Sequence, residues 1–292
     1  MLVAWYTRFL GRELVVYSIG SKLTALACVC VVALGLVSCG GGGGAEGSGG
    51  VDGKQGGTLT ILAASSLTDA FGELGNAFEE QNRGTTVKQT FGASSDLLAQ
   101  IQQGAPGDVF ASAAEEEMDT AEKEGLVSGT PRVFVKNREV IMVPRNNPAD
   151  INGLEDMAGP DIKLVLVAED VPAADYAVEI LGKANKEYGP GFEKDVLSNV
   201  VSREADVRAS VNRVVVGDAD ATFGYASDYT PDIRDEVKVI PIPPDLNIIA
   251  TYPIASLQDA EDPELAKKWV DLVTSEKGQK VLEKWNFEPA AQ

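Results

Sequence analysis

Apolar and polar residues alternate with two different periods along residues 57–292, and these periods predict strands and helices. Short apolar runs such as 58–63 and 221–225 have the length and residue types of buried strands. The segment 67–81 repeats its apolar residues at helical spacing instead, which places on one face Leu67, Ala70, Phe71, Leu74 and Phe78. The two patterns take turns to the C-terminus, so strands and helices follow one another along the whole segment.

The order of these patterns predicts the fold class. Strands are expected at 58–63, 86–91, 108–111, 139–143, 163–168, 221–225 and 237–242. Helices are expected at 67–81, 96–102, 115–124, 174–187, 205–216, 263–274 and 276–285. A repeated strand-then-helix order indicates an α/β fold in three layers with largely parallel sheets.

The same succession indicates how the chain divides. The part that begins near residue 57 is long enough for one large domain or for two lobes. Segments 132–144 and 236–253 lie between blocks of strand–helix units, so they are the expected crossings between lobes. We therefore expect one lobe from 57–137 together with 236–292, and a second lobe from 138–235.

The N-terminus has the features of a secretory signal. Residues 23–37 are apolar apart from a few small residues, and three basic residues precede them: Arg8, Arg12 and Lys22. A positive flank, an apolar run and small residues before the cut are typical of a signal peptide, and Cys39 at the cut marks the lipoprotein kind. We expect a signal peptide at 1–38 and lipidation of Cys39. An uncleaved membrane anchor is the alternative, although an apolar run of about 15 residues is short for a bilayer span.

Residues 39–56 are dominated by glycine and cannot form a packed core. This composition predicts a flexible tether with a root-mean-square span of roughly 20–25 Å. Both interpretations of the N-terminus place the globular part outside the cytoplasm. It is expected to be lipid-anchored to the cell membrane through Cys39 or, in the alternative, held there by the uncleaved anchor.

Charge and missing residue types exclude several functions. The chain has a formal net charge of −19, and removal of residues 1–38, whose net charge is +2, would bring it to −21. So acidic a protein is a poor partner for nucleic acid or anionic lipid. Histidine, the usual general base and the commonest transition-metal ligand, is absent from the sequence. Cys28 and Cys30 lie in the expected signal, so no structural disulfide is expected.

Small residues and serines stand where expected strands turn into helices. Ser66 follows the first strand and Ser94 the second, while Pro172 suits a first helical turn. Ser66 stands where an N-cap belongs, with Asp69 three residues on, close to a capping-box pattern. Free N–H groups and the positive end of the helix dipole make such helix starts potential anion-binding sites, and ligands of open α/β sheets lie beyond the carboxyl ends of the strands. Ordinary capping is the alternative interpretation of each serine.

Several blocks of the sequence resemble the molybdate-binding proteins of ABC importers. The blocks extend from about residue 58 to residue 289 in the order and spacing of that family. They are AASSLTDA at 63–70, FGASSDL at 91–97, GAPGDVF at 104–110, VPA at 171–173, DVR at 206–208 and GYASD at 224–228. The expected signal and glycine tether fit the lipoprotein form of such proteins.

This resemblance implies a two-lobed periplasmic-binding-protein fold of type II, with molybdate or tungstate in the cleft between the lobes. It implies that the oxyanion is held by hydrogen bonds from Ser66, Ser94, Ala173, Val207 and Tyr225. Ala173 and Val207 would contribute only backbone groups, and Ser95 is an alternative to Ser94. No protein atom would bind the metal directly, and no cofactor is expected. The implied partners are an ABC permease and, through the lipid on Cys39, the membrane; a monomer is expected.

Other interpretations of the same residues stay open. The protein could bind another oxyanion such as sulfate, or it could be a ligand-sensing lipoprotein that docks on a membrane receptor. Tyr176, Tyr225 and Tyr229 suggest a ferric site, although iron binders of this fold usually add histidine or a dense tyrosine cluster. Arg208 is a further candidate for direct contact with an anion. An enzyme is not expected, because a serine triad cannot be assembled without histidine.

Two features receive purely structural interpretations. The acidic run at 115–117 is expected to form a solvated helix face. Trp269 and Trp285 lie on the C-terminal helices and are expected to pack against the core.

Overall fold

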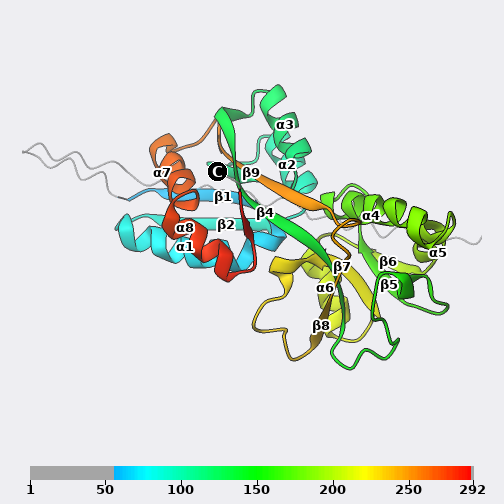
Figure 1. The fold of residues 1–292 in the computed structure, drawn as a ribbon. Helices are drawn as coiled ribbons and strands as arrows, with labels where there is room; N and C mark the ends of the chain where they lie inside the picture. Colours follow the sequence, from blue (N-terminus) through cyan, green and yellow to red (C-terminus); the bar gives the residue numbers. More distant parts are fainter. Residues whose placement is uncertain (1–55, 291–292) are drawn as a thin grey trace, which may run out of the picture. The chain divides into compact units, whose positions relative to one another are not determined.

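The computed structural model describes residues 56–290 (Figure 1). The signal peptide expected at 1–38, Cys39 and nearly all of the expected tether lie outside the described residues. Within 56–290 there is no helix with the length and hydrophobicity that a membrane crossing requires.

Strands and helices follow one another as the sequence patterns predict. The strands are β1 (Thr58–Ala64), β2 (Thr86–Gly92), β3 (Val109–Ala111), β4 (Val127–Pro144), β5 (Leu164–Val167), β6 (Val200–Glu204), β7 (Ala221–Tyr225), β8 (Val237–Pro241), β9 (Ile249–Leu257) and β10 (Glu288–Pro289). The α-helices are α1 (Thr68–Gln81), α2 (Ser94–Gln102), α3 (Glu115–Lys123), α4 (Pro172–Tyr188), α5 (Phe192–Ser198), α6 (Val207–Val215), α7 (Pro263–Val273) and α8 (Glu276–Lys284). Short 3₁₀ turns are η1 (Ser65–Leu67), η2 (Glu155–Ala158) and η3 (Ala226–Asp228).

The strands form two sheets that share β4. In the first sheet β2, β1 and β3 are parallel, and β9 joins β3 to the N-terminal part of β4. In the second sheet the C-terminal part of β4 pairs with β7 and β8, and β7 leads to the parallel strands β5 and β6. Arg138 is the last β4 residue paired with β9, and Glu139 is the first paired with β7. The chain therefore passes from one sheet to the other within a single strand.

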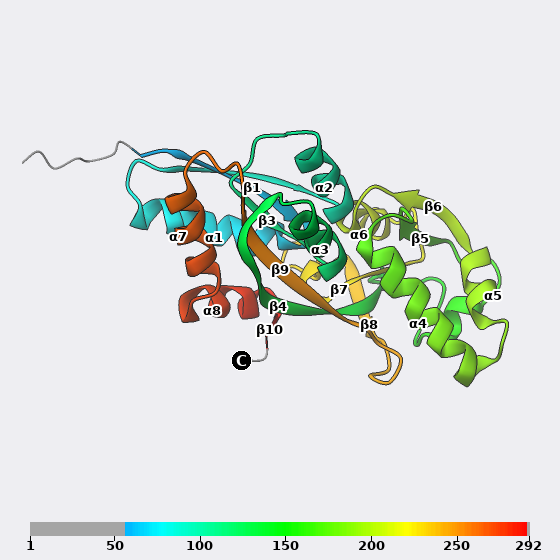
Figure 2. The ribbon, with the colours of Figure 1, turned by 90° about the horizontal axis from the view of Figure 1, so that it is seen from above.

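Each sheet with its helices forms one lobe of a two-lobed α/β fold, as the sequence predicts (Figure 2). Successive side chains of a strand point to opposite faces of its sheet, so neighbouring residues of β1 contact different layers of helices. Ile61 packs with α1 and α7, whereas Leu62 packs with α2 and α3. Trp269 of α7 lies edge-on to Phe71 and Phe78 of α1, which confirms its expected packing role.

The second lobe has the same three-layer construction. Leu166 of β5 packs with Ile180 of α4, and the neighbouring Val165 packs with Val211 of α6. Helices therefore cover both faces of this sheet. The lobe limits expected from the sequence, 57–137 with 236–292 and 138–235, stay a prediction.

The sequence patterns miss part of the sheet. The expected connections 132–144 and 236–253 overlap β4 and β9, whose residues outside 139–143 the patterns do not predict as strand, and neither β6 nor α5 is predicted. Pro253 in β9 weakens the strand pattern, because proline cannot donate to a ladder. The two long antiparallel strands make the sheets mixed, so the expectation of largely parallel sheets holds only for β1–β3 and for β5, β6 and β7.

Candidate anion-binding site

A small cavity lies where the two lobes meet, at the carboxyl ends of β1, β2 and β7. It is lined by Ala64, Ser65, Ser66, Gly92, Ala93, Ser94, Ala113, Val171, Pro172, Ala173, Val207 and Tyr225. All five residues that the sequence resemblance implies as ligands are in this set, and the set contains no charged side chain. The cavity volume is about 10 Å³ for a water-sized sphere, room for about one water molecule.

Ser66 stands directly beyond β1, in the 3₁₀ turn η1, and is 3% exposed. Its hydroxyl lies 2.9 Å from the hydroxyl of Tyr252, and either group can be the donor. The expected helix cap is wrong, because Leu67 is the N-cap residue of α1 and no side chain caps it. Tyr252 competes for the serine hydroxyl, and it comes from β9, a strand that the sequence pattern did not reveal.

Ser94 is the first residue of α2 and is 1% exposed. Its Oγ accepts a hydrogen bond of 2.9 Å from the backbone N–H of Ala113, another residue of the cavity wall. Since the oxygen acts as acceptor in this bond, the hydroxyl hydrogen stays available to a ligand. Ser95 is not a lining residue, and its buried Oγ has no hydrogen-bond partner among residues 56–290. Of the two serines, the structure therefore places Ser94 at the cavity.

The opposite wall is made by the starts of two helices. Ala173 is the second residue of α4, after Pro172, and Val207 is the first residue of α6. Backbone N–H groups in a first helical turn have no partner inside the helix, and they carry the positive end of the helix dipole. Asp206 fixes the start of α6 by accepting a 3.0 Å hydrogen bond from the N–H of Ala209. Two helix N-termini therefore meet the cavity on this side.

Tyr225 completes this wall as the last residue of β7. It is 1% exposed, and its hydroxyl has no hydrogen-bond partner within the described part of the chain. Burial raises the pKa of Tyr225 well above its usual value, so the phenol is neutral and can donate. The preceding Gly224 allows close packing of α6, because a Cβ there would lie 3.3 Å from Cγ2 of Val211.

Contacts on either side of the cavity join the two lobes. Arg208 of α6 forms an ion pair with Asp69 of α1, and its Nε lies 3.3 Å from Oδ1 of Asp228. Asp228 in turn accepts a 3.1 Å hydrogen bond from the N–H of Tyr225. Arg208 is thus engaged by carboxylates and does not line the cavity, contrary to its suggested role as a direct contact. On the other side, the hydroxyl of Tyr176 donates to the carbonyl of Ala113 at 3.5 Å.

Other residues singled out by the sequence do not form a second site. Tyr229 lies against Arg234, 5.5 Å from ring centroid to guanidinium, and is not part of the cavity wall. Within 56–290, no group of three or more acidic or cysteine side chains is arranged to hold a metal ion. The acidic run is not wholly solvated as expected: Glu117 is partly buried, and burial raises its pKa to about 7.

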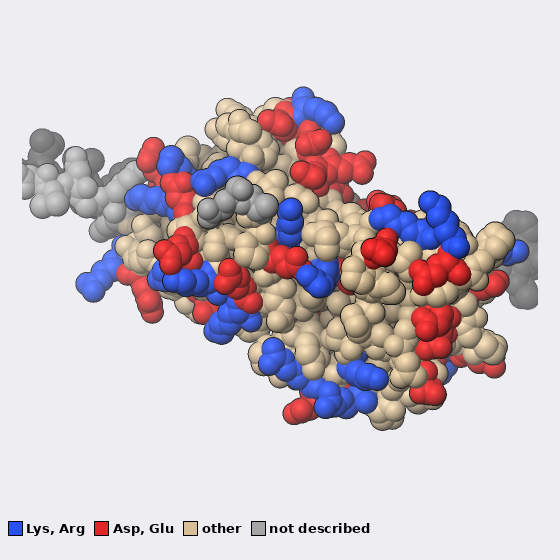
Figure 3. All heavy atoms as spheres, in the orientation of Figure 1, with Lys and Arg blue, Asp and Glu red and all other residues tan. Residues whose placement is uncertain are grey.

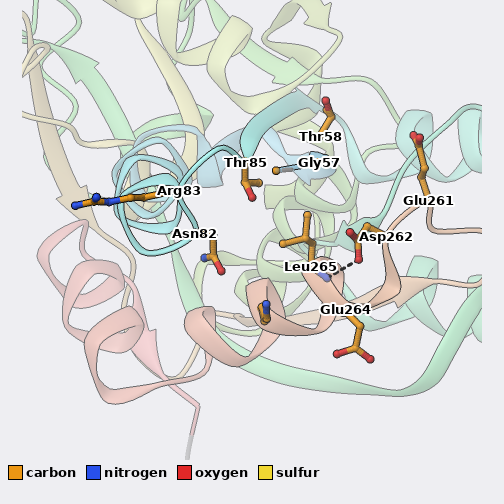
Figure 4. Close-up of a pocket in the computed structure, with 11 residues that line it drawn as sticks. Gly57, Thr58, Asn82, Arg83, Thr85, Glu261, Asp262, Glu264 and Leu265 are labelled. Carbon is orange, nitrogen blue, oxygen red and sulfur yellow. Dashed lines mark hydrogen bonds between the residues drawn. The ribbon is translucent and has the colours of Figure 1, made fainter. Parts of the chain in front are cut away.

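A larger cavity, about 570 Å³, opens near the opposite end of β1 (Figure 4). Residues of β1, of the segment after α1 and of α7 line it, among them Thr58, Arg83 and Glu264. In Figure 4 the charged groups of Arg83 and Glu264 point away from one another. This cavity is wide, but its polar groups do not converge on one point as those of the small cavity do.

Two sheets joined through β4, with neutral hydrogen-bond donors converging between them, define the class of two-lobed solute-binding proteins. The model of the family described as bacterial extracellular solute-binding protein matches residues 59–288. The chain belongs to this family.

Individual relatives agree with this assignment. A molybdate-binding protein of Mycobacterium tuberculosis, ModA, is 33% identical over 265 residues, which cover 90% of this chain and 96% of the relative. The substrate-binding domain of a molybdenum ABC transporter from Clostridium difficile is similar in structure, with a TM-score of 0.60 and 28% identity over 80% of this chain and all of that one. The sulfate-binding protein SubI of Mycobacterium tuberculosis has a TM-score of 0.70 at 19% identity over 80% of this chain and 87% of that one, and so shares the fold.

Proposed function

We propose that this protein captures molybdate, or the similarly sized tungstate, outside the cytoplasm and delivers it to an ABC permease. The observation that carries the proposal is the convergence of Ser66, Ser94, Ala173, Val207 and Tyr225 on one uncharged cavity. The molybdate-binding relative at 33% identity supports the choice of ligand.

The chemistry of the wall suits a fully deprotonated oxyanion. Hydroxyls and backbone N–H groups donate hydrogen bonds, and a bond to a charged group contributes about 1.5–3 kcal/mol. Hydrogen phosphate carries a proton that needs an acceptor, and the lining offers it mainly donors. Helix N-termini add a favourable electrostatic field without a formal charge. The geometry thus favours an unprotonated tetrahedral anion.

Local contacts, and not long-range attraction, are proposed to hold the anion. The chain is strongly acidic, and on the face drawn in Figure 3 the basic side chains lie interspersed with acidic ones. A negative protein repels an anion at long range, and salt screens that repulsion beyond about 10 Å. Short hydrogen bonds in a desolvated cavity are not weakened in this way, so they are the interactions that we assign to binding.

We further propose that the protein binds its ligand without transforming it. The cavity wall contains no pair of a nucleophile and a general base, since its side-chain polar groups are serine and tyrosine hydroxyls. In this proposal Cys39 is lipidated, the protein is a monomer, and the segment 39–56 lets it reorient above the membrane to meet the permease. The lipid anchor is testable by labelling cells with a radioactive fatty acid and comparing the wild type with Cys39→Ala.

Titration calorimetry with four anions tests the proposed ligand. Molybdate and tungstate should bind at least about a hundredfold more tightly than sulfate or phosphate, a difference of about 2.8 kcal/mol. The donor set alone also suits sulfate, and a sulfate-binding protein shares the fold. Equal affinities for sulfate and molybdate would therefore replace the proposal with a general oxyanion binder.

A further inference from the structure

Glu139 is a fully buried carboxyl at the point where β4 passes between the sheets. Its exposed fraction is 0%, and neither carboxyl oxygen has a hydrogen-bond partner among the described residues. Buried carboxyls are nearly always paired with a cation or hydrogen-bonded, since an isolated buried charge is very costly. The unpartnered state of Glu139 therefore requires an explanation.

The position of Glu139 connects it to the cavity. It pairs directly with Tyr225 in the antiparallel register of β4 and β7. Residues that face each other in this way project to the same side of the sheet, with Cβ atoms about 4.5–5.5 Å apart. Tyr225 lines the cavity, and its hydroxyl also lacks a partner among residues 56–290. The carboxyl thus lies next to the cavity wall, on the same side of the sheet as the Tyr225 ring.

Within the described part of the chain, the charge that acts on the pKa of Glu139 is that of a carboxylate and not that of a cation. Asp228 on η3 and the phenols of Tyr176, Tyr225 and Tyr252 interact electrostatically with it. The nearby Arg208 pairs with Asp228 and with Asp69, not with Glu139. Burial, and then the negative charge of Asp228, raise the pKa of Glu139 well above its usual value. Burial and the charge of Asp228 therefore both favour the protonated acid.

We propose that Glu139 must hold its proton for the oxyanion to bind, so that one proton on this residue is thermodynamically coupled to ligand binding. The inference rests on the proposed function. A carboxylate at this position would place a second negative charge close to the anion in a region of low dielectric constant, where charges repel strongly. The protonated acid carries no such charge. By reciprocity, a bound anion makes Glu139 hold its proton more firmly.

The sign of the pH dependence follows. Below the pKa of Glu139 in the ligand-free protein the acid is neutral, and affinity does not change with pH. Above that pKa the carboxyl is ionised before binding, and each anion that binds must take up one proton. The logarithm of the association constant should then fall with a slope that approaches −1 per pH unit, which is about tenfold for each unit.

Calorimetric titration of the whole protein with sodium molybdate, at half-unit steps from about pH 6.5 to pH 10, tests this coupling. Repeating each titration in two buffers of different ionisation enthalpy measures the protons taken up. Wild-type protein should approach one proton per molybdate at alkaline pH. Glu139→Gln, which resembles the neutral acid in shape, should keep the affinity of the wild type at the lowest pH and lose both the slope and the proton uptake.

Glu117→Gln is the matched control, because Glu117 on α3 also has a raised pKa, whereas the charge that raises the pKa of Glu139 is that of Asp228 and not that of Glu117. This variant should keep the alkaline slope. The proposal is overturned if the wild type shows no proton uptake up to pH 10, if Glu139→Gln keeps the slope, or if Glu117→Gln abolishes it. A loss of affinity in Glu139→Gln at every pH, with an unchanged melting temperature, would also contradict a neutral role.

Failure of this inference can be told apart from failure of the proposed function. Molybdate binding to wild-type protein at the lowest pH tests the function alone and does not involve the titration of Glu139. If molybdate does not bind there, the proposed function fails. If it binds and no proton is coupled at higher pH, the role of Glu139 fails and the function stands.

Discussion

The two walls of the cavity use different chemistry. The wall beyond β1 and β2 presents the hydroxyls of Ser66 and Ser94, and both oxygens already contact other protein groups. The wall made by α4, α6 and β7 presents backbone N–H groups and the unpartnered hydroxyl of Tyr225. Substitutions can remove donors from the first wall, whereas most donors of the second wall persist whatever the side chain. The contribution of each wall can therefore be measured separately.

The largest effects are expected on the first wall. Ser66→Ala and Ser94→Ala each remove one hydrogen bond to a charged ligand in a desolvated cavity, which contributes about 1.5–3 kcal/mol. Molybdate affinity, measured by calorimetry, should fall about ten- to a hundredfold for each variant.

Ser95→Ala is the matched control for this prediction, because Ser95 neighbours Ser94 but does not line the cavity. Its affinity should stay within about twofold of the wild type. Ser66→Ala also leaves the buried hydroxyl of Tyr252 with only a 3.4 Å contact to Asn137, so its melting temperature should fall as well. Wild-type affinity in both Ser66→Ala and Ser94→Ala would show that the ligand binds elsewhere.

Tyr225→Phe should have a smaller effect on affinity, about tenfold, because one neutral donor is lost and the ring stays. Its effect on stability separates the two walls. The Tyr225 hydroxyl has no partner in the described part of the chain, so its removal leaves no protein group unsatisfied. Thermal unfolding without ligand should show an unchanged or slightly higher melting temperature. A clear decrease would mean that this hydroxyl already stabilises the ligand-free fold.

Two carboxyls with raised pKa values make stability depend on pH. Burial raises the pKa of Glu117 from 4.5 to about 7 and that of Asp228 from 3.8 to about 6. The unfolded chain loses these protons at the lower values, so stability falls as the pH rises through this window. The pKa values of Glu73 and Asp271 are lowered in the folded protein, so these two groups make stability rise with pH. They do so only below their ordinary pKa values of 4.5 and 3.8.

The melting temperature should therefore fall between about pH 4.5 and pH 7, by a few degrees at most for a partly exposed group such as Glu117. Glu117→Gln should reduce the fall, and Glu73→Gln should leave its size unchanged. A melting temperature that rises over this range would show that both carboxyls are ionised in the folded protein at little cost.

The difference between the walls also explains what the sequence could predict. Ser66 and Ser94 stand in a local pattern, serine after a buried strand, whereas Ala173 and Val207 are implied as ligands only by the resemblance to the molybdate-binding family. The sequence pattern does not reveal Tyr252, because its strand contains Pro253 and the segment 236–253 has the features of a connection. Glu139 was missed because a glutamate in a strand normally faces solvent. Only the crossing of β4 between sheets buries Glu139, and no local pattern encodes that crossing.

The smallest effect on affinity is expected from Val207→Ala. The backbone N–H of Val207 remains in this variant, so molybdate affinity should stay within about twofold of the wild type. The side chain is buried against Gly224 and the core of the second lobe, and its truncation should cost about 1–3 kcal/mol of stability. Val211→Ala, one turn further along α6 and outside the cavity wall, is the matched control with a similar loss of stability. If Val207→Ala loses much more affinity than Val211→Ala at equal stability, the side chain itself shapes the cavity, and the second wall does not act through its backbone alone.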